Sequence, residues 1–128
     1  MKTKLEDTGK EKNGLVKEYF NDGKLSGEGE YVRGVKTGEW RFYLRNGNLK
    51  AVGTFAHGKF TGLWKWWREN GKTLQEGEFE NGEQVGLWKR YHDNGELMDV
   101  GNYRDGKRTG EWKFYDKSGT LIKTKSFK

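Results

Sequence analysis

Large apolar side chains recur along the chain with a period of 24 residues, which is the mark of a repeat architecture. Tryptophan shows the period most clearly, at Trp40, Trp64, Trp88 and Trp112. Within a unit, Trp40 and Phe42 alternate with Arg41 and Tyr43, so in an extended strand the two pairs lie on opposite faces. Glycine and Asn-Gly pairs interrupt every segment before two helical turns can form. The pattern therefore predicts β-strands and argues against helices.

Each unit contains two turn signals built on glycine. The first is Asn46-Gly47, Asn70-Gly71, Asn94-Gly95 and Ser118-Gly119, and the second is centred on Gly34, Gly58, Gly82 and Gly106. Asn-Gly between strand-forming residues predicts a two-residue type I′ hairpin, in which both central residues have positive φ. A turn at Asn46-Gly47 predicts four cross-strand pairs: Leu44 with Leu49, Phe42 with Ala51, Trp40 with Gly53 and Gly38 with Phe55.

The constant period also predicts how one hairpin meets the next. If Trp64 falls in line with Trp40, Gly53 lies opposite Trp64 and Phe55 lies opposite Gly62. Every tryptophan then has glycine on both neighbouring strands, which leaves room for the indole to lie flat over the backbone. This explains glycines that would otherwise weaken a strand by roughly 0.5–1 kcal/mol each.

The expected architecture is all-β: an elongated, single antiparallel sheet of five 24-residue hairpin units with about ten strands. The units start near Gly14, Gly38, Gly62, Gly86 and Gly110, and together they form one repeat domain over residues 14–128. Such a sheet would be on the order of 45 Å long, and it should twist or curl. Val16 replaces tryptophan in the first unit, as expected for an atypical terminal repeat. Residues 1–13 are polar and are expected to form a mobile N-terminal tail.

Composition agrees with a thin sheet. The 128 residues include 20 glycines and no proline, and 31% are hydrophobic while 15% are aromatic. Burial must therefore come from a few large rings and not from a thick core. The absence of cysteine excludes disulfides and thiolate metal sites, and two separated histidines give a transition-metal site little support, so we expect no metal and no cofactor.

Charge favours acidic partners without defining one. The formal net charge is +6, but 19 acidic residues are interleaved with 25 basic ones, which gives a mixed surface. The first 13 residues contain no apolar run that could act as a signal peptide or a membrane span. The expected location is the cytoplasm by default, or outside it if an export signal has been trimmed.

The repeat resembles the MORN-repeat-variant family. The resemblance rests on the pattern G-x-W-x-x-Y-x-x-N-G-x-L-x-x-x-G-x-Y-x-x-G-x-x-x-G, which appears as GLWKRYHDNGELMDVGNYRDGKRTG from Gly86 to Gly110. Five copies of the pattern cover residues from about 14 to 128. The resemblance implies an elongated sheet of successive hairpins that acts as a scaffold or interaction module. It also implies an antitoxin-like role, since bacterial members are often labelled antitoxins, and contact with phospholipid, which has been proposed for some members. It implies no catalytic residue.

Two candidate binding surfaces follow from the predicted faces. One is an aromatic groove formed by Trp40, Phe42, Trp64, Trp66, Trp88, Trp112 and Phe114. The other is a basic and aromatic face formed by Arg41, Tyr43, Lys65, Trp67, Lys89, Tyr91, Lys113 and Tyr115. On this second face Lys65 should pair with Glu76 and Lys17 with Glu28, whereas Arg41, Lys89 and Lys113 face Val52, Val100 and Thr124 and have no acidic partner.

These surfaces leave two functions open. The first is a non-enzymatic module that binds another protein through the aromatic groove, with a cognate toxin as one version of that partner. The alternative is an electrostatic binder of acidic phospholipid headgroups or nucleic acid through the basic face. No Ser-His-Asp arrangement, phosphate loop or other catalytic spacing is present, so we expect no enzyme activity. The last strand, near Leu121 to Phe127, offers an edge through which two copies could pair.

Overall fold

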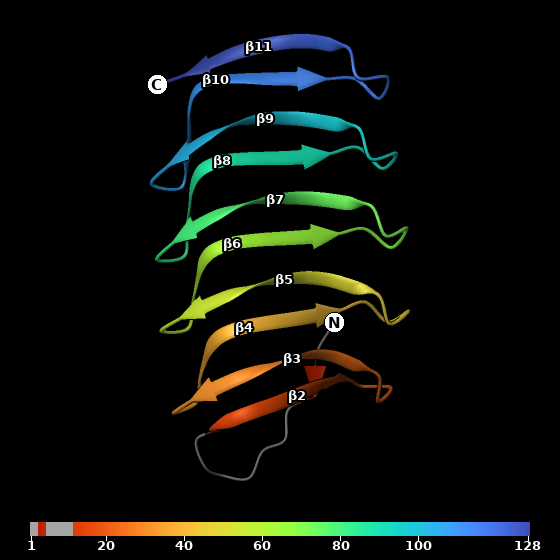
Figure 1. The fold of residues 1–128 in the computed structure, drawn as a ribbon, viewed down its shortest axis with the longest axis vertical. Coiled ribbons are helices and arrows are strands. Elements are labelled where there is room, and N and C mark those ends of the chain that lie inside the picture. Colours follow the sequence, from red (N-terminus) through yellow and green to blue (C-terminus); the bar gives the residue numbers. More distant parts are fainter. Residues whose placement is uncertain (1–2, 5–11) are drawn as a thin grey trace.

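The computed structural model describes residues 3–4 and 12–128. In this range the chain is one antiparallel meander in which every strand pairs with the next in sequence (Figure 1). The strands are β1 (Thr3–Lys4), β2 (Gly14–Phe20), β3 (Leu25–Val32), β4 (Val35–Tyr43), β5 (Leu49–Ala56), β6 (Lys59–Trp67), β7 (Thr73–Glu80), β8 (Glu83–Tyr91), β9 (Leu97–Arg104), β10 (Lys107–Tyr115) and β11 (Leu121–Phe127). The predicted single sheet of hairpin units is confirmed.

The hairpins stack along the long axis of the molecule, and their strands are curved (Figure 1). The ten long strands, β2 to β11, supply the five predicted units. The additional strand β1 lies within the segment expected to be a tail, and it pairs Thr3 with Phe20 and Lys4 with Tyr19. The rest of that expected tail, apart from its last two residues, lies outside the described residues.

The register within a hairpin follows the prediction over most of its length. Between β4 and β5, Gly38 lies opposite Phe55, Trp40 opposite Gly53 and Phe42 opposite Ala51. Nearer the turn the prediction is wrong, because Tyr43 and not Leu44 lies opposite Leu49. An extra residue on β5 causes this shift, which is a β-bulge.

The turn at Asn46-Gly47 differs from the predicted type I′ geometry. Gly47 has a φ of 90°, but Asn46 is not among the described residues with positive φ. The Gly47 amide donates to the Leu44 carbonyl at 2.9 Å, and the Leu44 amide donates to the Asn48 carbonyl at 2.8 Å. This is a three-residue loop with a left-handed glycine, the next most common hairpin connection. Asn46 favours it because its Oδ1 accepts the Asn48 amide at 2.9 Å.

The type I′ turns are instead the connections between hairpin units. Both central residues have positive φ at Arg33-Gly34, His57-Gly58, Asn81-Gly82 and Asp105-Gly106. These turns bring Phe55 opposite Phe60, and so the predicted pairing of Phe55 with Gly62 is wrong. The reason is a second bulge: Val52 pairs with Lys65 but Thr54 pairs with Thr61, which leaves Gly62, Leu63 and Trp64 facing the single residue Gly53. Gly62 has a φ of 67°, as a bulge glycine requires.

Each tryptophan is held between glycine and a backbone carbonyl. A Cβ added to Gly53 would lie 1.9 Å from Cδ2 of Trp64, so only glycine fits beneath this indole. The Trp64 Nε1 donates to the Thr54 carbonyl at 3.0 Å, and the other three tryptophans bond in the same way ten residues back in the chain. The predicted role of the strand glycines as space for the indole is confirmed. Two glycines flank each tryptophan, one on each neighbouring strand. The indole lies over the glycine on the preceding strand only.

Candidate functional site

The aromatic side of the sheet is a continuous packing of rings. Trp40, Trp64, Trp88 and Trp112 are each no more than 2% exposed, so they form the core of the sheet. Phe55 packs edge-on against Trp64, with ring centroids 5.2 Å apart, and the other units have the same kind of contact. Four of the seven residues predicted to form the aromatic groove are therefore buried, and Phe42, Trp66 and Phe114 are the half-buried ones.

One further position in each unit lies over the indole, and its residue differs from unit to unit. Lys36 Nζ is 5.0 Å from the Trp40 ring centroid, and Arg108 lies 4.6 Å from that of Trp112. Phe60 stacks on Trp64 at 4.1 Å. Gln84 and Trp88 line the same small pocket in the fourth unit. A cation in two units and a ring in a third thus cover the same core, and the unit at Trp64 carries the densest ring cluster.

Beside the half-buried rings of Phe60, Phe79 and Tyr103, the aromatic side presents one row made by one residue from each of four units. These residues are Phe42, Trp66, Arg90 and Phe114, of which the three rings are half-buried and Arg90 is exposed. Trp66 stacks on Trp64 with centroids 5.6 Å apart, and Phe42 stacks on Trp40 at 5.7 Å. We call these four residues the groove row. Glu18 holds the corresponding position in the first unit and is buried, where it accepts a 2.8 Å hydrogen bond from the Tyr31 hydroxyl.

The groove row is interrupted by one ion pair, of which only the carboxylate is buried. Asp99 is 1% exposed and lies directly opposite Arg90. The Arg90 Nε donates to the two carboxylate oxygens at 3.1 and 3.2 Å, and the Arg90 Nη2 donates to Oδ2. The hydrogen bonds to Asp99 raise the pKa of Arg90 above its usual value, which keeps the guanidinium charged. The equivalent pair in the second unit is Phe42 and Ala51. The same two positions therefore hold an ion pair in one unit and two apolar residues in another.

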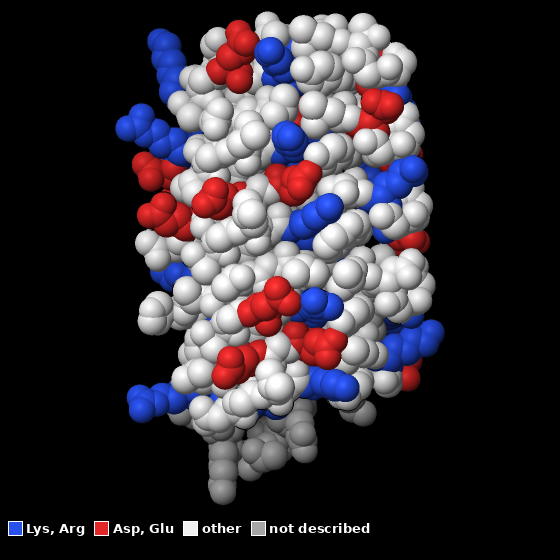
Figure 2. Space-filling model, in the orientation of Figure 1, with Lys and Arg blue, Asp and Glu red and all other residues white. Residues whose placement is uncertain are grey.

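The opposite face carries a ladder of charged residues along the whole sheet. From β2 to β11 the residues opposite one another are Lys17, Glu28, Arg41, Val52, Lys65, Glu76, Lys89, Val100, Lys113 and Thr124. Positive and negative residues alternate from Lys17 to Arg41 and from Lys65 to Lys89, and side chains of both signs lie down the middle of the face seen in Figure 2. The predicted pairs of Lys65 with Glu76 and Lys17 with Glu28 are confirmed. The prediction that Arg41 and Lys89 lack an acidic neighbour is wrong, because it considered only one of the two flanking strands.

Arg41 lies opposite Glu28 on β3, and Lys89 lies opposite Glu76 on β7. Arg41 also approaches Glu39 of its own strand, with Nε 3.4 Å from the carboxylate. Lys113 does fit the prediction, since its neighbours across the ladder are Val100 and Thr124. The basic charge of this face is therefore partly neutralised by its own glutamates.

Tyrosines beside the ladder hold two of these glutamates. The Tyr43 hydroxyl donates to Glu28 and the Tyr91 hydroxyl donates to Glu76. Burial and the bond to Glu76 raise the pKa of Tyr91 to about 12, and the bond to Glu28 together with burial raises the pKa of Tyr43. In the third unit the corresponding residues are Val52 and Trp67, and Lys65 Nζ lies 5.2 Å from a Trp67 ring centroid. Trp67 and Trp66 thus lie on opposite faces, as predicted.

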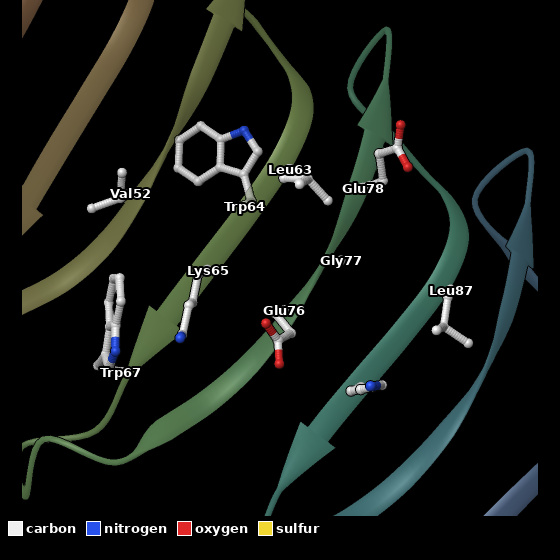
Figure 3. Close-up of a pocket in the computed structure, with 10 residues that line it drawn as sticks. Val52, Leu63, Trp64, Lys65, Trp67, Glu76, Gly77, Glu78 and Leu87 are labelled. Atoms are coloured by element: carbon white, nitrogen blue, oxygen red, sulfur yellow. The ribbon is translucent and has the colours of Figure 1, made fainter.

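A hollow of about 540 Å³ on this face was not predicted from the sequence. Its lining includes Val52, Leu63, Lys65, Trp67 and Leu87, together with Trp64, Glu76, Gly77 and Glu78 (Figure 3). Leu63 is 76% exposed and Leu87 is 52% exposed. The signal for it was present, since leucine precedes tryptophan in these two units where glutamate does so in the second and fifth.

The remaining candidate positions have structural surroundings. His57 is exposed in a turn, while His92 Nε2 lies 2.8 Å from the Tyr115 carbonyl of the next unit. Tyr115 is half-buried beside the charged ladder. Within residues 12–128 and 3–4, no group of three or more His, Cys, Asp or Glu residues is placed to hold a metal ion. The same part of the chain has no helix long and apolar enough to cross a membrane.

The sequence matches the family model described as MORN repeat variant at residues 12–33, 36–57, 60–81, 84–105 and 108–128. These five matches cover most of the chain, and the protein belongs to the MORN repeat variant family. Its repeats therefore define it as a β-sheet protein of a family whose members generally serve as binding modules.

No curated protein matches the sequence. Among solved structures, a chain of the "Crystal structure of GtfA/B complex bound to UDP and GlcNAc" is similar with a TM-score of 0.35 and 10% identity. The match covers 91% of this chain and 23% of that chain, so this protein spans less than a quarter of its length. A similarity at this level carries no argument about function.

Proposed function

We propose that this protein is a non-enzymatic interaction module that binds another protein along the groove row. The observation that carries the proposal is the contrast between two sets of positions in the same repeat. The core position is tryptophan in four units, whereas the groove row beside it reads Phe42, Trp66, Arg90 and Phe114. Because the fold accepts a ring or an ion pair at this row, its sequence is free to serve a partner.

The chemistry of the row suits a protein partner. Aromatic residues and arginine are enriched at the energetic centres of protein interfaces. Trp66 and Phe42 are half-buried rings that stack on a rigid core, so little side-chain entropy would be lost when a partner covers them. Arg90 is held in place by Asp99 and adds one charged position in a row of rings.

The test is to compare variants as bait in affinity isolation from the cells that make the protein. Trp66→Ala should lower the affinity for the bound protein about tenfold or more, because it removes the largest accessible ring of the row. Tyr115→Ala, a half-buried ring on the opposite face, is the matched control and should retain the partner. Loss of the ligand only when Lys65, Lys89 and Lys113 are all changed to Glu, with acidic lipid or nucleic acid as that ligand, would contradict the proposal and favour the electrostatic alternative.

An antitoxin role is the narrower form of this proposal, and only the family resemblance supports it. In that form the partner is a toxin encoded beside this protein, and the module would occlude it. Co-expression of the neighbouring gene product with and without this chain tests it directly. If this protein neither binds that product nor relieves its toxicity, the antitoxin form fails while the general interaction role stands.

A further inference from the structure

The two ends of the array are related to each other by the repeat. Because the period is 24 residues, β11 is the fifth-unit equivalent of β3, and β2 is the first-unit equivalent of β4. Within the described residues, β11 has only β10 as a neighbour, and β1 pairs with the outer edge of β2 only at Tyr19 and Phe20. β2 of a second copy could therefore pair with β11 in the register that joins β4 to β3 (Figure 1). We call this contact the joint between copies.

The register of the joint brings opposite charges together. Between β3 and β4, Gly27 lies opposite Phe42. The equivalent positions at the joint are Lys123 of one copy and Glu18 of the next. No other unit has a basic residue at the Gly27 position or an acidic residue at the Phe42 position. The two ends of the array thus carry complementary charges at the two positions that would meet.

Both charged residues are able to interact across the joint. Lys123 Nζ lies 5.3 Å from the Phe114 ring centroid, and within the described residues it makes no salt bridge. Glu18 accepts a hydrogen bond from the Tyr31 hydroxyl and lies 3.8 Å from Lys36 Nζ, and both contacts are made by Oε2. The other carboxylate oxygen is therefore left to accept from Lys123 of a neighbouring copy.

The two ends also exchange a large residue for a small one. Wherever two units of the chain meet, an indole lies over a glycine, as Trp40 lies over Gly29. At the joint between copies the equivalent positions hold Val16 and Lys125. A tryptophan would collide with the Lys125 side chain, whereas Val16 leaves room for it. The larger residue on β11 is thus matched by the smaller residue on β2.

Pairing of two β11 strands about a two-fold axis lacks this complementarity. If the strands are antiparallel and centred on Thr124, Lys123 of each copy lies opposite Lys125 of the other. Like charges that lie directly opposite each other destabilise a strand pair. The lysines of β11 therefore disfavour a second β11 and favour a strand with an acidic residue, such as β2.

We infer that copies of this protein associate head to tail, with β2 of one copy added to β11 of the next, so that Glu18 meets Lys123 and Val16 meets Lys125. This contact joins two different surfaces, and each copy carries one of each. The association is therefore an open series and not a closed dimer. The groove rows of successive copies then lie on the same face of one continuous sheet.

Sedimentation equilibrium of the full chain, at concentrations up to about 1 mM, measures this association. We expect the weight-average mass to rise past that of two copies as the concentration increases. Lys123→Glu should lower the association constant about tenfold or more, because two carboxylates would then face each other at the joint. Lys50→Glu makes the same change of charge at an exposed residue of β5 and should leave the association constant unchanged.

A pair of substitutions tests the match in size. Val16→Trp introduces the residue that the other units have, and it should lower the association constant about tenfold or more because the indole meets Lys125. Adding Lys125→Gly removes that obstacle and should restore the association at least to the wild-type level. Far-ultraviolet circular dichroism checks that each variant is folded.

Three results would overturn the inference. The first is a wild-type chain that stays monomeric up to about 1 mM. The second is a mass that stops rising at two copies, which would indicate a closed pair. The third is that the folded Lys123→Glu and Val16→Trp variants associate as strongly as the wild-type chain.

Discussion

The contact between glycine and indole is the feature at the residue scale on which the rest of the sheet depends. Gly77 lies under Trp88, and a Cβ there would come within 2.1 Å of the Trp88 Cδ2. The indole cannot move away without breaking its Nε1 bond to the Glu78 carbonyl, which measures 3.0 Å. The glycine is therefore required by packing and not by its backbone freedom.

Gly77→Ala should destabilise the protein by about 2–3 kcal/mol, the upper range for an overpacked core. Urea unfolding followed by tryptophan fluorescence measures the effect. Gly71→Asn is the control, because Gly71 has a φ of 85° and open space around it, and asparagine tolerates that conformation. Equal losses for the two variants would show that the close packing of glycine and indole has been overstated.

Tyr91 provides a pH test of the charged face. Its pKa is raised from 10.0 to about 12, chiefly by burial and then by its hydrogen bond to Glu76. A raised pKa means that the folded state holds the proton more tightly, so this contribution to stability is present below pH 10 and is lost as the pH rises to about 12. Ultraviolet titration of the phenols should show one fewer high-pH group in Tyr91→Phe. An unchanged titration would contradict the assigned environment.

Much at this scale could be predicted from the sequence. The fixed distance from Trp40 to Gly53 predicted their pairing, and the alternation of Trp66 with Trp67 predicted their opposite faces. The burial of the four tryptophans could not be predicted from spacing alone. It depends on residues such as Phe60 folding over the indole, and the bulge at Gly62 that brings them there leaves no periodic signal of its own.

At the scale of the hairpin, turn chemistry was the weakest part of the prediction. Asn46-Gly47 matched the strongest signal for a type I′ turn, yet the Asn46 side chain stabilises a three-residue loop instead. The type I′ turns contain Arg33, His57, Asn81 and Asp105, of which only Asn81 and Asp105 would suggest that geometry. The structure accepts the others because strand pairing on both sides fixes the turn.

His57→Asn should therefore stabilise the protein slightly, since the short polar side chain of asparagine can hydrogen-bond locally in the left-handed conformation. The change copies Asn81 from the equivalent turn of the next unit. Thermal unfolding gives the comparison, and His57→Ala should lower the midpoint instead. A midpoint that falls with His57→Asn would mean that the exposed imidazole makes a contact of its own.

The Arg90–Asp99 pair allows a test of how strongly two facing residues of one hairpin depend on each other. Arg90→Phe alone should cost about 3 kcal/mol, because Asp99 is 1% exposed and would lose its donors. Adding Asp99→Ala recreates the Phe42 and Ala51 pair of the second unit and should recover most of that loss. Denaturant unfolding of both single variants and the double variant gives the unfolding free energies for a double-mutant cycle. Additive losses would show that the two residues do not act as a pair.

At the scale of the whole molecule, the last strand lacks the glycine that the other units place opposite tryptophan or its equivalent. Lys125 lies opposite Trp112 on β11, where the other units have glycine. A further unit could not place its indole over that position, and Val16 replaces tryptophan at the other end. The first and fifth units thus depart from the pattern of the three units between them.

The two faces of the array also differ in how far the sequence reveals them. The core face follows from the tryptophan period, and the charged ladder follows from the strand register. The hollow that includes Leu63 and Lys65 follows from neither, because its shape depends on side chains from several strands. Local patterns predict an element's faces better than the shape of the surface that several elements make together.

The central claim, that a partner protein lies along the groove row, is tested most directly by photo-crosslinking in the native cells. Benzoylphenylalanine would replace Phe42, Trp66 or Phe114 one at a time, and exposed Lys50 beside a hairpin turn would be the control position. The account predicts a covalent adduct to the same protein from two or more of the groove-row positions and none from position 50. The absence of a protein adduct at all three positions, with the protein folded and illuminated, would contradict it.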